Sequence, residues 1–118
     1  MSVGATLRAF LIPAGATVLA DDGPPVDVSQ YPYVTIFYSS SGTTSGGTVI
    51  LEEASYDPTK DKVPATWSQI ESRAASTFTG TVTLANHLAP AAYHWIRARI
   101  SSTITGGGSI SVVVKATQ

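Results

Sequence analysis

The chain of 118 residues has no cysteine, few charged side chains and no long apolar run. The absence of cysteine excludes a disulfide framework and a thiolate metal site. Charged residues make up 13% of the chain, about half of the usual share. Seven basic and eight acidic residues give a net charge of −1, whereas nucleic-acid-binding domains have a basic excess. No apolar segment approaches the ~18 residues of a membrane-spanning helix. We therefore expect neither a nucleic-acid partner nor a membrane partner.

Apolar residues and hydroxyl side chains dominate the composition. Apolar types account for 43% of the chain, and 14 serines and 15 threonines supply most of its polar groups. This length and apolar content are sufficient for one hydrophobic core but not for two, so we expect a single domain, residues 1–118. A nearly neutral surface has little self-repulsion, which suits a protein that functions in an assembly.

Short segments of alternating apolar and polar residues follow one another, separated by glycine, proline and hydroxyl-rich turns. This alternation has the period of two that a pleated strand imposes. We expect strands at residues 5–12, 16–20, 33–39, 48–54, 66–75, 77–85, 92–101 and 110–116, with a brief pairing at 26–28. The segment 66–75 also has apolar residues at helical spacing, but no clear capping signal precedes it. About eight strands spaced by roughly 8–12 residues predict an all-β fold, either an antiparallel β-sandwich or a jelly roll.

The N-terminal residues 8–20 have features of a signal peptide, because an arginine precedes an apolar run that ends in small residues. The single Arg8 and the proline at position 13 argue against that interpretation, and we expect strands of the mature fold instead. Residues 1–30 are thus predicted to be an arm or additional strands of the domain.

The last two predicted strands have the clearest separation of faces. One face is predicted to be apolar and to point inwards, with residues Ile96, Ala98, Ile100, Ile110, Val112, Val114 and Ala116. The opposite face is predicted to point outwards, with residues Tyr93, Trp95, Arg97, Arg99, Ser109, Ser111, Val113 and Lys115. Glycines tolerate the positive φ angles of tight turns, so we interpret Gly106–Gly108 as the turn of a hairpin between the two strands.

Residue types that catalyse reactions or bind metals are present, but their spacing is unproductive. His87 and His94 have no partner at metal-ligand spacing. Glu52 and Glu53 are adjacent, so a strand directs them to opposite faces. The loop at residues 57–61 lacks the dense carboxylate pattern of a calcium site. Nucleophile-elbow and phosphate-loop motifs do not occur. We therefore expect no catalytic residue, no metal site and no cofactor.

Five segments follow one another along the chain: a strand, a strand ending in acidic residues, a Trp-containing segment, an aromatic–Arg strand and a glycine-rich hairpin. This order resembles a β-sandwich pattern of tailed-phage virion proteins. The segments are 33–38, 47–54, 66–70, 93–101 and 107–112, within a resemblance that covers residues 31–116. Its size and lack of a fibre repeat make the chain most similar to small head decoration, or cement, proteins. The resemblance implies a domain that sits as a dimer or trimer on a capsid and staples neighbouring subunits.

These observations predict a non-enzymatic viral structural protein on the capsid exterior of a virion, a homo-oligomer that binds the major capsid protein. Aromatic and arginine side chains dominate binding energy at protein interfaces. The expected interface residues are Tyr93, Trp95, Arg97, Arg99 and Lys115.

Two other functions remain open. A carbohydrate-binding module of a phage tail or fibre would use a platform of aromatic rings, for which the candidates are Tyr31, Tyr33, Tyr38, Trp67, Tyr93 and Trp95. A small β-domain enzyme would require carboxylates or a histidine to converge in a cleft.

Overall fold

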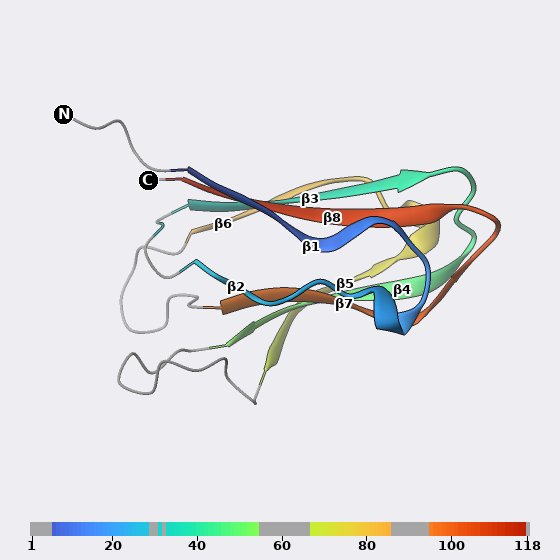
Figure 1. The fold of residues 1–118 in the computed structure, drawn as a ribbon, viewed down its shortest axis with the longest axis horizontal. Helices are drawn as coiled ribbons and strands as arrows, with labels where there is room; N and C mark the ends of the chain where they lie inside the picture. The colour runs from blue at the N-terminus through green and yellow to red at the C-terminus, as the bar shows by residue number, and fades with distance from the viewer. Residues whose placement is uncertain (1–5, 29–30, 32, 55–66, 86–94, 118) are drawn as a thin grey trace.

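Two antiparallel four-stranded sheets pack face to face in the computed structural model of the chain, which describes residues 6–28, 31, 33–54, 67–85 and 95–117 (Figure 1). The strands are β1 (Thr6–Ala16), β2 (Val26–Asp27), β3 (Tyr33–Ser41), β4 (Gly46–Ala54), β5 (Ser68–Ala74), β6 (Gly80–Ala85), β7 (Trp95–Thr105) and β8 (Ser109–Thr117). Sheet A has the strand order β1-β8-β3-β6, and sheet B has the order β2-β7-β4-β5. The predicted all-β sandwich is confirmed.

The strand order is that of a jelly roll. Consecutive strands among the described residues lie in different sheets, except for β4 and β5, and the first strand pairs with the last. An eight-stranded double sheet with this alternation is the jelly-roll topology. Each sheet therefore covers the apolar face of the other, and each also has an outer face of its own.

The predicted hairpin between the last two strands is wrong, because β7 belongs to sheet B and β8 to sheet A. The connection crosses from one sheet to the other as an arch, in which Gly106 and Gly107 have φ angles of 107° and 92°. A hairpin would place both apolar faces on one side and leave them for other strands to cover. The arch lets the apolar faces of β7 and β8 bury one another.

The predicted division between inner and outer faces is confirmed. All seven inward residues predicted on β7 and β8 are at most 1% exposed. They pack with side chains of β3 and β4 in one continuous core, for which Ile36 and Leu51 are examples. The alternation of the sequence thus identified the faces of these strands correctly, although not the strands that they pair with.

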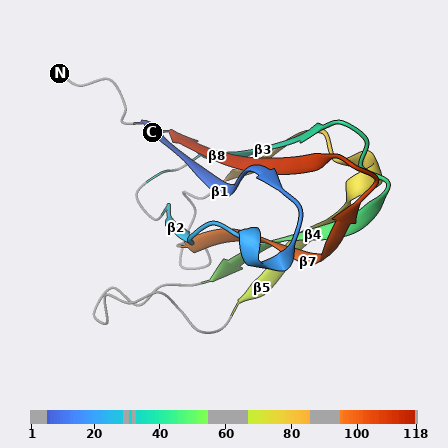
Figure 2. The ribbon, with the colours of Figure 1, turned by 45° about the vertical axis from the view of Figure 1, so that its right-hand side comes forward.

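The N-terminal segment differs from the prediction in two respects, the end of the first strand and the structure that follows it. Strand β1 extends to Ala16 through two register shifts, whereas residues 19–21 form a short 3-10 helix, η1 (Leu19–Asp21), in place of the strand expected at 16–20. The turn forms because the Asp21 carboxylate accepts hydrogen bonds from the backbone N–H groups of Thr17 and Val18, at 2.9 and 3.1 Å. The η1 segment runs beside β7 at one side of the sandwich (Figure 2). On either side of η1, β1 belongs to sheet A and β2 belongs to sheet B.

The segment between β4 and β7 agrees with the prediction over most of its described length. Residues 68–74 form a strand, as the interpretation of 66–75 requires. The following strand begins at Gly80 and not at residue 77, because a second 3-10 helix, η2 (Ala75–Thr77), carries the chain from sheet B to sheet A. Among the described residues, no helix is long and apolar enough to cross a membrane.

Candidate interaction surfaces

The outer face of sheet B carries an ion-pair network centred on one carboxylate. Arg97 and Arg99, two residues apart on β7, both donate from Nε to Oε1 of Glu52, at 2.8 and 3.0 Å. Glu52 lies opposite Arg97 in the β4–β7 register, and it is only 7% exposed. Charge-assisted hydrogen bonds of this kind orient both guanidinium groups. The two arginines are therefore held by the protein's own carboxylate.

Aromatic side chains extend this network. The guanidinium carbon of Arg97 lies 4.2 Å from the ring centroid of Trp67, a cation–π contact. Trp95, at the start of β7, is half-buried between Asp27 of β2 and Ala54 of β4 in the sheet register. The predicted outward stripe exists for Trp95, Arg97 and Arg99, but intramolecular contacts occupy much of it.

The edge of β7 next to β2 is capped by Asp22, the residue that follows η1. The backbone N–H of Ile100 on β7 donates to Oδ1 of Asp22 at 2.8 Å, at a position beyond the two residues that β2 covers. Burial raises the pKa of Asp22, and the bond from Ile100 together with the charges of Arg99 and Arg97 opposes that rise. The backbone bonds from Thr17 and Val18 hold the pKa of Asp21 below its ordinary value. Asp22 therefore replaces a backbone partner that a longer β2 would supply to β7, whereas Asp21 holds the turn of η1.

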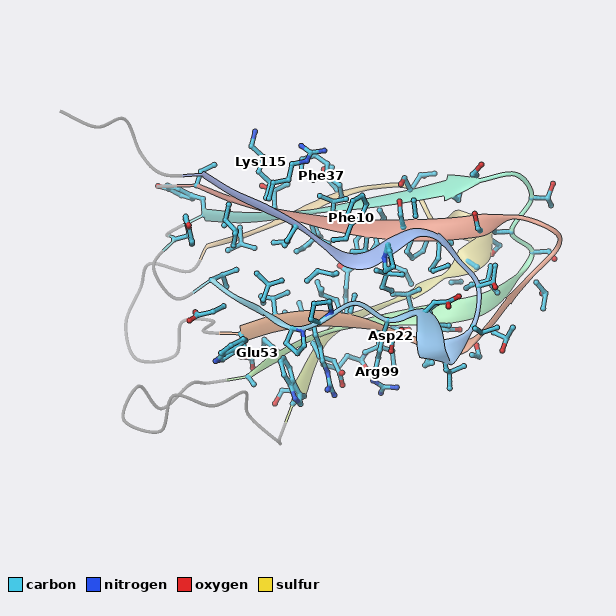
Figure 3. All side chains as sticks on the ribbon, viewed as in Figure 1. Phe10, Asp22, Phe37, Glu53, Arg99 and Lys115 are labelled. Atoms are coloured by element: carbon cyan, nitrogen blue, oxygen red, sulfur yellow. The ribbon has the colours of Figure 1, made fainter. Side chains whose placement is uncertain are left out.

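Lys115 does not belong to the same surface as the arginines. It projects from β8 on the outer face of sheet A, whereas Arg99 lies on the sheet B side of the sandwich (Figure 3). The prediction of one interface is therefore wrong in grouping Lys115 with Arg97 and Arg99. The cause is the arch between β7 and β8, which sends the outer faces of the two strands in opposite directions. Tyr93, the fifth predicted residue, lies outside the described residues.

The outer face of sheet A has an apolar row that the sequence interpretation missed. Phe10 of β1, Val113 of β8 and Phe37 of β3 are direct cross-strand neighbours in that order. Phe10 is 51% exposed, and Val113 and Phe37 are half-buried. The strand order places Phe10 and Phe37 on either side of Val113, and local alternation does not reveal that order.

The proposed aromatic platform for a sugar is not assembled as one surface. Tyr38 is in the core, with its ring edge-on to Phe78 at 5.1 Å and covered by Arg73 at 4.2 Å. Burial raises the pKa of Tyr38, and the nearby Glu71 carboxylate adds to the rise. Tyr33 lies on the outer face of sheet A and is 50% exposed, on the opposite side from Trp67.

Groups that suggest chemistry are sparse in the part of the chain that the structure describes. A shallow depression lined by residues 13–16 with Asp21 and Asp22 contains two carboxylates, and backbone N–H groups engage both of them. Within the described ranges, no group of three or more His, Cys, Asp or Glu side chains could hold a metal ion. His87, His94 and the loop at 57–61 lie outside those ranges. In the β4–β7 register, Glu52 lies opposite Arg97 and Glu53 lies opposite Ile96, so the two carboxylates are on different faces of the sheet, as expected.

Comparison with known proteins gives matches of structure only. No protein-family model matches the chain, and no curated protein matches it. The fold is similar to the crystal structure of PBSX exported protein XepA, with a TM-score of 0.64 and 16% identity, covering 100% of this chain and 39% of that one. It is also similar to SPBc2 prophage-derived protein YomS, with a TM-score of 0.63 and 9% identity, covering 100% of this chain and 97% of that one. The chain thus spans well under half of XepA. Both neighbours are phage-derived proteins, and at these identities the likeness concerns the fold.

Proposed function

We propose that this chain is a non-enzymatic structural protein of a phage virion, a decoration protein that binds the major capsid protein from outside as a homo-oligomer. The observation that carries the proposal is the similarity to YomS, which extends over all of this chain and 97% of that prophage-derived protein. A jelly roll of this size offers two broad outer faces, and sheet surfaces of this kind suit contacts with neighbouring proteins. The resemblance of residues 31–116 to virion β-sandwich proteins agrees with this proposal.

The disposition of four of the six described carboxylates favours a structural role over an enzymatic one. Glu52 is bound by two arginines, and Glu71 is paired with Arg73 at 2.6 Å. Asp21 and Asp22 accept hydrogen bonds from backbone groups. Glycoside hydrolysis uses a pair of carboxylates that flank the substrate at a defined separation. These four are instead directed to separate partners within the fold.

A second candidate is an exported phage protein that acts away from the particle. It is favoured by one observation, the name of XepA, which describes that protein as exported. A third candidate function is carbohydrate binding, through the exposed ring of Tyr33 on sheet A or the ring of Trp67 on sheet B. Binding to a glycan array that depends on either ring would support it.

Fractionation of the encoding phage separates the first two candidates. Particles purified on a density gradient are probed with an antibody to this chain, alongside the cell-free fraction. The proposal expects the protein to band with particles and to stay there after tails are removed. Protein found only in the particle-free fraction would contradict it.

A further inference from the structure

We propose that the outer face of sheet A binds a second copy of this chain, through the apolar row Phe10–Val113–Phe37. This inference rests on the proposed function, because it names the surface through which the decoration protein would form its homo-oligomer. The row crosses three of the four strands of the sheet without interruption. The exposed Phe10 and the half-buried Val113 and Phe37, in register across the sheet, form an apolar patch of the kind that marks an association site.

The charges beside the row restrict what can cover it. Arg8 and Lys115 are cross-strand neighbours two residues from Phe10 and Val113, and both are exposed. In the register, other residues of the face whose side chains are described are Tyr33, Thr35, Ser39, Ser41, Thr81, Ser109, Ser111 and Thr117. The cations therefore lie on one side of the row only, hydroxyl groups lie on both sides, and none of these described side chains is a carboxylate.

This arrangement is self-complementary under a two-fold rotation about the row. Such a rotation stacks the apolar row on its own copy and exchanges the two sides of the row. Lys115 is then placed over Ser111 of the second copy, because the two residues lie equally far from Val113 along β8. Successive residues rise about 3.3 Å, so the two lysines stay roughly 13 Å apart along the strand direction. Serine hydroxyls can accept hydrogen bonds from the ammonium group.

The size of the face is adequate for a stable pair. Four strands at about 4.8 Å spacing and the nine residues of β8 span roughly 19 by 30 Å, before side-chain relief is added. Specific protein interfaces cover about 800 Å² of accessible surface on each partner. Of the two outer faces, this one fits a copy better, because the arginines of sheet B are already paired with Glu52.

Sedimentation equilibrium of the full chain tests the inference. We expect a concentration-dependent dimer for the wild-type protein and a dissociation constant raised at least about tenfold by Phe10→Asp, since a charge would be buried in the row. Ser72→Asp, at an exposed position on β5 of sheet B, is the matched control and should leave the constant unchanged. A wild-type monomer at all concentrations, or equal constants for the two variants, would overturn the inference.

A cross-linking variant keeps the test decisive if Phe10→Asp fails to fold. The chain has no cysteine, so Val113→Cys introduces a single thiol at the position of the two-fold axis. Oxidation should convert this variant to covalent dimers, whereas Ser72→Cys should remain monomeric on denaturing gels. Equal cross-linking of the two variants would indicate random collision and contradict the inference.

The two proposals fail in different ways. If the wild-type protein is a dimer that Phe10→Asp dissociates, but it is never found with phage particles, self-association through sheet A is supported and the capsid role is contradicted. The opposite result is a protein that is found on particles, whose dissociation constant is unchanged by Phe10→Asp and which does not cross-link through Val113→Cys. It would support the capsid role and contradict self-association through sheet A.

Discussion

Glu52 is the residue on which the outer face of sheet B depends. Its side chain is almost fully covered, yet two guanidinium groups share one of its oxygens. Burial of a carboxylate is costly unless charge-assisted hydrogen bonds compensate it. The alternation of the sequence predicted that Arg97 and Arg99 share a face, but the partner on β4 is 45 residues away from Arg97 in sequence. Local pattern cannot identify such a partner, and the arginines were therefore interpreted as free for an external protein.

We expect Glu52→Ala to lower the free energy of unfolding by about 2 kcal/mol, because it leaves two neighbouring cations without their common acceptor. The figure is below that of a fully buried pair because both arginines are about a third exposed. Glu53→Ala, at the adjacent position on the other face, is the control and should cost under about 0.5 kcal/mol. Urea denaturation measures both values. Equal losses would contradict the role assigned to Glu52.

The two aspartates of the η1 segment predict opposite pH effects. Burial raises the pKa of Asp22, so the folded protein holds that proton more tightly, and stability falls as pH rises from about 3.8 through the folded-state pKa. The pKa of Asp21 is lowered by its backbone bonds, so its contribution is present above about pH 3.8 and is lost as pH falls through the folded-state pKa.

Urea denaturation of the wild type and the variants, between about pH 2 and pH 7, checks these signs. Relative to Asp22→Asn, which keeps an acceptor for the Ile100 N–H, the wild type should lose stability with rising pH. Relative to Asp21→Asn, the wild type should gain stability as the pH rises. The same sign for both pairs would contradict the assignment.

Among the elements, the arch between β7 and β8 places the outer faces of these two strands on opposite sides of the molecule. The period-two pattern predicted both strands and their buried sides correctly, since that pattern depends on local alternation. Whether two consecutive strands form a hairpin or an arch depends on what covers their apolar faces, and this is set by strands distant in sequence. The same limit explains the missed row on sheet A, because Phe10 is 103 residues and Phe37 is 76 residues from Val113 in sequence, and they become neighbours only when the sandwich has closed.

Gly47 combines a positive φ angle with a close backbone approach to β7. It lies in β4 at a register shift, with a φ of 110°, and a Cβ atom there would meet the Thr103 carbonyl oxygen at 2.7 Å. We expect Gly47→Ala to cost roughly 3 kcal/mol, from backbone strain and steric overlap together. Gly107→Ala, at a φ of 92° with open space around the added atom, should cost about 1 kcal/mol. Thermal unfolding compares the two, and an equal cost would indicate that the approach of β4 to β7 is looser than described.

At the scale of the whole molecule, the two outer faces differ in how their charge is compensated. Sheet B satisfies Arg97 and Arg99 internally through Glu52, whereas sheet A presents Arg8 and Lys115 beside an exposed apolar row. With these two cations set apart, the rest of the chain has five basic and eight acidic residues, a net charge of −3. In our proposal the outer face of sheet A binds a second copy of the chain, and the remaining, acidic part of the surface is available to the capsid.

Co-sedimentation with purified capsids of the encoding phage, freed of this protein, tests the central claim most directly. The wild-type chain should pellet with the capsids and saturate at a fixed number of copies per capsid subunit, and bovine serum albumin should stay in the supernatant. A chain that remains in the supernatant at every concentration, while its fold and oligomeric state are intact, would contradict the proposal that it decorates the capsid.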